Sequence, residues 1–254
     1  MSIQNIQPWM FRVKHENFVL LLTLLVILVA GFLIYSLNLY LIIGLIIFSL
    51  IYVRLNQLQY LGSAIKVHSM QFQEIYEVFK RYATKLRIQN ASLYIKQDPS
   101  LNAYTLGYST CTVVLTSSLV EQLSDQELNF VIGHELGHYC AGHTLITTLF
   151  TPLGSGNWIS SLLFGIWNRK TEYSADRCGL ILTKNIDSAI TSLIKLSLGA
   201  KLFERFNLTG YLPQLKRSDS SSVKLSESLL DHPLATSRIK NLSEFWRVNF
   251  VKNI

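Results

Sequence analysis

A long run without charge near the start of the chain constrains its fold most strongly. Residues 17–53 contain no Asp, Glu, Lys or Arg, whereas Glu16 and Arg54 stand at the two edges of the run. As one helix, the apolar part would measure about 54 Å at about 1.5 Å per residue, well beyond the roughly 30 Å of a bilayer's hydrocarbon layer. We therefore expect a transmembrane hairpin over residues 18–53, with two spans and a turn at Ser36-Leu37-Asn38.

The basic residues that flank this run predict its orientation. Two precede the hairpin and two follow it: Arg12, Lys14, Arg54 and Lys66. Because positive charge favours the cytoplasmic side, both ends are expected there. A signal peptide is disfavoured, since the first apolar run is too long and lacks a small-residue cleavage site. The sequence thus predicts an integral protein of the inner or plasma membrane, with residues 1–17 and 54–254 facing the cytoplasm.

Charge and cysteine content narrow the partners and the compartment. The formal net charge is +7, but the basic residues are scattered and form no nucleic-acid-binding motif. Attraction to an anionic lipid surface accounts for the charge more simply, so we expect a lipid bilayer and no nucleic acid as partner. The three cysteines, Cys111, Cys140 and Cys178, are an odd number without CxxC spacing, which favours a reducing compartment.

The rest of the chain predicts a mostly helical α+β domain. Apolar residues at helical spacing indicate an amphipathic helix over residues 69–88. Residues 91–95 and 111–116 are rich in β-formers and predict a small sheet. Ser124-Asp125-Gln126-Glu127 is a capping-box pattern, so a helix is expected to begin at Asp125.

The C-terminal part has fewer elements that the sequence can place. The Ser-rich segment 217–228 reads as a polar loop, and a final helix is expected at about residues 234–245. Residues 54–254 are accordingly assigned to one domain.

Several groups that can bind metal or move protons lie within the stretch FVIGHELGHYCAGH, residues 130–143. On a helix each residue advances about 100°, so that relative to His134, His138 lies at about 40° and Glu135 at about 100°. These three side chains share one side of the helix. Two imidazoles one turn apart can hold a zinc ion, while the glutamate reaches a zinc-bound water without binding the metal.

The two other groups of the stretch fall on a different side of the same continuous helix. Cys140 lies near 240° and His143 near 180°, so neither is expected to be a ligand. Thr144 occupies the position at which a metzincin would have its third histidine, which excludes that class. A buried helix with structural histidines is the alternative, but it would bury polar side chains without partners.

A catalytic zinc site needs a third protein ligand and an open fourth position. The segment TEYSADRCG, residues 171–179, offers Glu172 and Asp176 one turn apart on one helix face. Glu172 can close the site, and Asp176 can accept a hydrogen bond from a ligand histidine and fix its tautomer. The segment DHPLATSRI adds His232 and Arg238 around a helix start at Pro233.

Four blocks of sequence, in this order, resemble the integral-membrane zinc metalloproteases that include HtpX and the CAAX prenyl proteases. They are NAYTLG (102–107), VVLTSSLVEQLSDQELNFVIGHELGH (113–138), EYSAD (172–176) and HPLATSRI (232–239). The resemblance covers roughly residues 92–246.

The resemblance implies roles for individual residues. His134, His138 and Glu172 would bind one zinc ion per chain, and Glu135 would be the general base. Asn102 and Ala103 would hold extended substrate at a strand edge. His232 would lie near the reacting carbonyl, and Arg238 would support the site.

One segment departs from the family pattern. HtpX-like proteins have two further membrane spans between the zinc helix and the glutamate helix, whereas residues 144–167 are too few to cross twice and are broken by Pro152, Gly154 and Gly156. Three interpretations stay open for this segment: a shallow apolar hairpin in the membrane, a flap over the cleft, or core packing. With two spans, the chain has no evident means to build an enclosed chamber for a prenylated peptide.

The sequence therefore predicts a membrane-anchored zinc metalloendopeptidase of the gluzincin type, with residues 54–254 as its catalytic domain. It would hydrolyse membrane-associated or misfolded proteins, with Glu135 activating a zinc-bound water. A catalytically silent membrane adaptor that keeps the fold is the alternative. Glu135 argues against it, because a purely structural zinc site is usually closed by four protein ligands and does not need this group. A zinc hydrolase of non-peptide bonds is a third interpretation that the motif leaves open.

Overall fold

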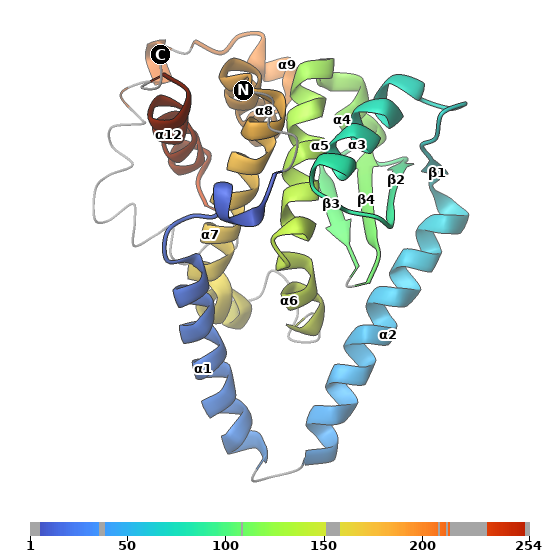
Figure 1. Ribbon diagram of the computed structural model, residues 1–254, viewed down its shortest axis with the longest axis vertical. Helices are drawn as coiled ribbons and strands as arrows, with labels where there is room; N and C mark the ends of the chain where they lie inside the picture. Colours follow the sequence, from blue (N-terminus) through green and yellow to red (C-terminus); the bar gives the residue numbers. More distant parts are fainter. Residues whose placement is uncertain are drawn as a thin grey trace.

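Helices predominate in the protein, and a small sheet packs beside them (Figure 1). The computed structural model describes residues 6–35, 39–107, 109–150, 158–207, 209–211, 213 and 233–251. In chain order the elements are η1 (Pro8–Met10), α1 (Glu16–Tyr35), α2 (Leu39–Ser63), β1 (Ile65–Lys66), α3 (Gln73–Lys85), β2 (Ala91–Lys96), β3 (Ala103–Leu106), β4 (Cys111–Thr116), α4 (Ser117–Gln122), α5 (Asp125–Cys140), α6 (His143–Phe150), α7 (Trp158–Thr183), α8 (Ile186–Leu198), α9 (Ala200–Phe203), α12 (Ala235–Trp246) and η3 (Arg247–Val251). The mostly helical α+β class with a small sheet is confirmed.

Helices α1 and α2 extend away from the rest of the molecule, toward the bottom of the view (Figure 1). Many of their large apolar side chains are exposed, including Phe18, Leu21, Leu28, Phe32, Ile47, Phe48 and Ile51. Over the described ranges, however, no helix has both the length and the apolar character that crossing a membrane requires. The predicted pair of transmembrane spans therefore finds no support here, and its turn at 36–38 lies outside the described residues.

The four strands form one mixed sheet in the order β1-β2-β4-β3. β2 and β4 are parallel, with Leu93 opposite Val113, whereas β1 and β3 each pair antiparallel with a neighbour. The two strands expected from their β-branched and aromatic residues are present: β4 has the predicted bounds, and β2 is one residue longer. β3 lies at an edge, and in the described part of the chain no strand pairs with its second side.

Helix α5 begins where its capping box predicted and ends earlier than expected. The Ser124 N–H donates to Glu127 Oε2 at 2.8 Å, and Lys195 Nζ lies 2.8 Å from the same oxygen. The helix stops at Cys140, because the chain turns at Gly142 in the left-handed region with φ of +79°. A single helix through His143 was therefore the wrong expectation, and His143 instead begins α6.

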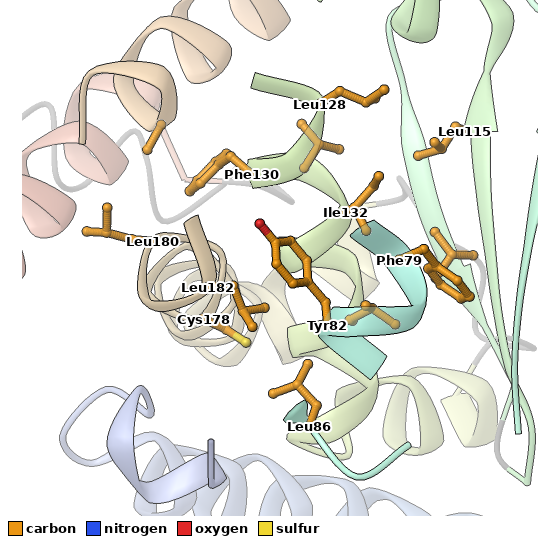
Figure 2. Close-up of a cluster of buried hydrophobic side chains, with 14 of the residues drawn as sticks. Phe79, Tyr82, Leu86, Leu115, Leu128, Phe130, Ile132, Cys178, Leu180 and Leu182 are labelled. Carbon is orange, nitrogen blue, oxygen red and sulfur yellow. The ribbon is translucent and has the colours of Figure 1, made fainter. Parts of the chain in front are cut away.

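The hydrophobic core lies between α3, the sheet, α5 and α7. Figure 2 shows Phe79 and Tyr82 of α3 near Ile132 of α5, with Cys178 of α7 in the same cluster. Helix α3 begins later than the amphipathic pattern predicted, because Phe72 adopts a left-handed conformation with φ of +60°. The final helix, α12, matches its predicted position within one residue at each end.

Helices α5 and α7 approach each other closely at three glycines. A Cβ added at Gly137 would lie 2.7 Å from Cys178 Cβ, and one at Gly179 would lie 2.8 Å from the Phe130 carbonyl oxygen. Gly133 faces Gly179 Cα in the same way, at 3.0 Å. Because α5 carries the HELGH motif and α7 carries Glu172, this close approach brings the two halves of the site together.

Gly137→Ala is expected to destabilise the metal-free protein by about 1–3 kcal/mol, because the added methyl group overpacks against Cys178. It should also weaken metal binding, since any separation of α5 from α7 moves Glu172 from the histidines. Chemical denaturation measures the first effect and zinc titration the second. Gly62→Ala is the matched control: its Cβ meets nothing within 4 Å, so the higher helix propensity of Ala should leave stability unchanged or raised. Equal effects of the two changes would contradict the packing argument.

Residues 6–16, called here the N-terminal segment, pack against the core of the molecule. Ile6 and Phe11 are buried in the main core, and the Ile6 N–H donates to the Lys85 carbonyl oxygen at 3.0 Å. The Val13 N–H donates to Ser174 Oγ of α7 at 3.0 Å. The segment therefore crosses α7 before α1 begins at Glu16.

The segment 144–167 is divided between two helices. Its first part belongs to α6, residues 151–157 lie outside the described residues, and α7 begins at Trp158 and continues past Glu172. Trp167 is buried whereas Ile166 is 55% exposed. Core packing therefore describes Trp167, and the membrane and flap interpretations of the segment stay predictions.

Candidate metal centre

Three side chains from two helices converge on one point. His134 and His138 lie one turn apart on α5, and Glu172 faces them from α7. Glu172 Oε2 is 3.6 Å from His134 Nε2, Glu172 Oε1 is 3.5 Å from His138 Nε2, and the two Nε2 atoms are 3.1 Å apart. Two imidazole nitrogens and a carboxylate oxygen within 4.8 Å of one another can hold a metal ion. This donor set matches a catalytic zinc site with three protein ligands.

Glu135 lies beside this group but belongs to a different contact. It is buried on α5, and the Thr105 hydroxyl of β3 lies 2.8 Å from its Oε2 and 3.1 Å from its backbone carbonyl oxygen. In the described part of the chain, the residues that can share a metal ion do not include Glu135. The carboxylate is thus placed next to the metal position and fixed by an edge strand of the sheet.

His134 is held from behind by a buried ion pair. Its Nδ1 lies 3.0 Å from Asp176 Oδ1, and Arg238 of α12 donates to both oxygens of Asp176, at 2.6 and 2.9 Å. Arg238 Nη1 also lies 3.1 Å from Glu172 Oε2. Burial raises the pKa of Asp176, but the charge and hydrogen bonds of Arg238 outweigh it and hold this pKa below its usual value. An ionised Asp176 accepts the Nδ1 proton of His134 and leaves Nε2 free to bind metal.

His138 has a different partner behind it. Its Nδ1 lies 3.1 Å from Nδ1 of His143, and His143 Nε2 lies 2.9 Å from Glu16 Oε1 at the start of α1. Burial lowers the pKa of His143 to about 4, although the hydrogen bond with Glu16 opposes this shift. Burial raises the pKa of Glu16, but the hydrogen bonds from His143 and Ser174 and the charge of Arg12 hold it below its usual value.

Opposing electrostatic effects act on His138. Burial lowers the pKa of His138, but the hydrogen bond and charge of Glu172 and the charge of Glu135 raise it above its usual value. Because only the neutral imidazole is a ligand, a metal ion and a proton compete for this side chain.

The predicted substrate-binding residues lie at the edge of the sheet. The Thr116 N–H donates to the Asn102 carbonyl oxygen at 3.1 Å, which sets the alternation of β3 against β4. Alternate residues of β3, Ala103 and Thr105, therefore direct their backbone groups to the second side of the strand. There the Ala103 N–H donates a hydrogen bond to the side chain of the preceding residue, at Asn102 Oδ1, over 2.9 Å.

Some site residues were predicted and others were missed. His232 lies outside the described residues, so its proposed place near the reacting carbonyl stays a prediction. Thr105, His143 and Glu16 were not assigned any role from the sequence. Thr105 carried a faint signal, since it lies within the NAYTLG block, whereas Glu16 comes to the site from 127 residues before His143 and gave none.

Comparison with known proteins finds a matching family model and several relatives named as metallopeptidases or proteases. The model of the family described as peptidase family M48 matches residues 69–162 and 152–245. A plastoglobule-localized metallopeptidase 48, chloroplastic, from Arabidopsis thaliana is 29% identical over 212 residues, which cover 75% of this chain and 62% of the plant protein. A protease HtpX homolog from Streptococcus uberis is 27% identical over 188 residues, covering 71% of this chain and 62% of that protein. A protease HtpX homolog from Streptococcus pyogenes is 27% identical over 184 residues, with the same two shares. The chain thus spans less than two thirds of the length of these curated relatives.

Proposed function

Since this chain belongs to peptidase family M48, we propose that it is a membrane-anchored zinc metalloendopeptidase of the gluzincin type. The resemblance seen in the four sequence blocks is confirmed at the level of the family, and so is the general class of metalloprotease. The bound metal, the substrate and the membrane are the parts that we propose.

The proposal rests on a difference between neighbouring side chains of α5: two histidines face Glu172, whereas the glutamate between them does not belong to the ligand group. His134 and His138 point their Nε2 atoms at Glu172, whereas Glu135 between them is held by Thr105 and stays outside the ligand group. A structural site has no use for a buried carboxylate placed next to the metal position but withheld from it. A hydrolytic site needs that group as a base.

The chemistry divides between the metal and the side chains. One zinc ion per chain, held by His134, His138 and Glu172, would act as a Lewis acid that polarises the peptide carbonyl and acidifies a water molecule. Glu135 would take the proton of the attacking water and pass it to the leaving amine. Asp176 orients His134, and Arg238 holds Asp176 and Glu172 in place.

Two further roles follow from the family resemblance. His232 would donate a hydrogen bond to the oxyanion that forms as the carbonyl is attacked. Asn102 and Ala103 would bind an extended peptide at the open side of β3, as an added strand. The Asn102 side chain occupies the Ala103 N–H in the absence of a peptide, so we propose that this side chain moves aside when substrate pairs with the strand.

Membrane attachment is supported by the surface of α1 and α2. Both helices present many exposed Leu, Ile, Val and Phe side chains, and a monomeric protein rarely leaves a large contiguous apolar surface in water. We propose that a lipid bilayer, of the inner or plasma membrane, covers this surface while the catalytic domain faces the cytoplasm. Substrates would be membrane-associated or misfolded proteins, and nucleic acid is not among the proposed partners.

The proposal is tested by one experiment on protein reconstituted into phospholipid vesicles. After flotation on a density gradient, the vesicle fraction should contain the protein, about one zinc per chain, and an activity that cleaves an unfolded protein at internal bonds. A zinc chelator should abolish the cleavage, and added zinc should restore it. Mass spectrometry of the fragments identifies the cleaved bonds.

The other interpretations predict different results in the same experiment. Vesicle-bound protein that carries zinc but cleaves nothing would support the silent adaptor. Hydrolysis of ester substrates without any peptide cleavage would support a hydrolase of non-peptide bonds. Activity that stays at the bottom of the gradient, away from the vesicles, would overturn membrane anchoring but not the proposed protease activity.

A further inference from the structure

The two histidines of the metal centre are supported by different groups. His134 Nδ1 meets the ionised carboxylate of Asp176, an arrangement expected behind a metal ligand. Among the residues that the structure describes, the partner of His138 Nδ1 is a second imidazole, that of His143, and not a carboxylate. The carboxylate lies one step further on, where His143 Nε2 meets Glu16.

The proton positions along this chain of contacts are determined by the outermost group. Glu16 is an ionised carboxylate and can only accept, so His143 donates through Nε2–H. A neutral His143 then has a lone pair on Nδ1, which accepts the Nδ1–H of His138. His138 is left with a lone pair on Nε2, the atom that faces Glu172 and the metal position. The order of donors thus fixes the tautomer that a metal ligand requires.

We propose that Glu16 and His143 form an orienting arm for His138, and that the N-terminal segment is thereby a working part of the metal centre. This inference rests on the proposed zinc chemistry, but it concerns residues that lie outside the zinc motif. Both are positioning residues, since they act on the metal through His138.

The arm can hold its position because the N-terminal segment is fixed at several points. The Ser174 hydroxyl donates to Glu16 Oε2, and the Val13 N–H donates to the same hydroxyl oxygen at 3.0 Å. Arg12 donates to the Ala141 carbonyl oxygen at the end of α5. Glu16 and His143 are only 3% exposed each, so water does not compete for these bonds.

The arrangement also connects the metal centre to the apolar helices. Glu16 is the first residue of α1, whose exposed apolar side chains follow directly (Figure 1). Any displacement of α1 from α7 would withdraw the carboxylate from His143. By reciprocity, a metal ion that fixes His138 should also strengthen the attachment of the N-terminal segment.

A purely structural role is the competing explanation. Glu16 and His143 would then satisfy each other as buried polar groups and contribute only to folding. In that case their replacement would lower the free energy of unfolding but leave the zinc affinity of the folded protein unchanged.

Two variants and a matched control separate the two explanations. Glu16→Gln keeps the size and an accepting oxygen but removes the charge. His143→Phe removes both nitrogens and keeps a ring against Trp167, whose ring centre lies 6.0 Å away. Glu121→Gln makes the same chemical change as Glu16→Gln at an exposed position on α4.

Zinc dissociation constants are measured by competition with a chelator, on full-length protein that has first been stripped of metal. We expect zinc binding to weaken about tenfold in Glu16→Gln and about 100-fold in His143→Phe, the range seen when the partner of a ligand histidine is removed. The double variant should be no weaker than His143→Phe within about twofold, because both changes break one arm. Glu121→Gln should bind zinc as the parent does.

Amide hydrogen exchange provides the second readout. Zinc should slow exchange in peptides that cover residues 6–16 of the parent protein, and this protection should be lost in His143→Phe. A group with only a structural role would not make the exchange of this segment depend on zinc. If His143→Phe fails to fold, Glu16→Gln carries both measurements.

The outcomes distinguish this inference from the proposed function. Parent protein that binds no zinc would overturn the proposed function and the arm together. Parent protein that binds zinc, with Glu16→Gln and His143→Phe within twofold of its affinity, would overturn the arm alone.

Discussion

Glu135→Gln is expected to lower kcat by about 10²–10⁴-fold while the protein keeps about one zinc per chain. The amide cannot accept the proton of the attacking water, but it has the shape of the carboxylate and its carbonyl oxygen can accept from Thr105. Helix α5 and the ligands on it should therefore stay in place. Peptide cleavage and zinc content are measured on the same preparation.

Two outcomes would contradict this interpretation. A variant that cleaves at near the parent rate would remove Glu135 from the mechanism. Loss of zinc together with activity would mean that Glu135 helps to hold the metal, contrary to its position outside the ligand group. Thr105→Val is a useful comparison, because it removes the hydroxyl but leaves the base, so activity should fall less than in Glu135→Gln.

Local signals in the sequence predicted the elements that are stabilised locally. The capping box at Ser124 placed the start of α5, and the β-branched run at residues 111–116 placed β4, because both patterns act within a few residues. Strand β3 was harder to find, since AYTL is short and lies at an edge. Its position was implied only by the family resemblance.

The predicted position of His143 relative to His138 was wrong, because it assumed one continuous helix. Calculated angles put His143 on the far side of a continuous helix, away from the metal. The left-handed turn at Gly142 ends that helix and returns His143 toward His138. Gly142 alone does not predict the end of the helix, because helices also tolerate glycine within them.

Long-range contacts could be predicted only where the residues at both ends carry a chemical signal. Glu172 was paired with His134 and His138 because two histidines one helical turn apart need a third protein ligand to form a catalytic zinc site. Glu16, in contrast, appeared only as the charged edge of an apolar run. Its contact with Ser174 joins residues 158 positions apart, and nothing in either local sequence specifies it.

The buried charges around Glu172 set the expected effects of changes there. Arg238 is shared between Asp176 and Glu172, and it is buried with them. When either carboxylate is removed, Arg238 still pairs with the remaining carboxylate. Neither change therefore leaves a buried guanidinium without a charged partner. The effects of the two substitutions on zinc binding can therefore be compared directly: Glu172 is a proposed ligand, whereas Asp176 acts through His134.

Glu172→Gln is expected to weaken zinc binding by more than about 100-fold and to lower activity with it. The change removes the carboxylate of the proposed ligand group. Asp176→Asn instead removes only the acceptor for His134 Nδ1 and should weaken zinc binding about 10–100-fold. The predicted order of zinc affinity is thus parent, then Asp176→Asn, then Glu172→Gln. Saturating zinc should partly restore the activity of Asp176→Asn. A Glu172→Gln variant whose zinc affinity lies within threefold of the parent would mean that the third ligand is another residue, and His232, which lies outside the described residues, would be the first to test.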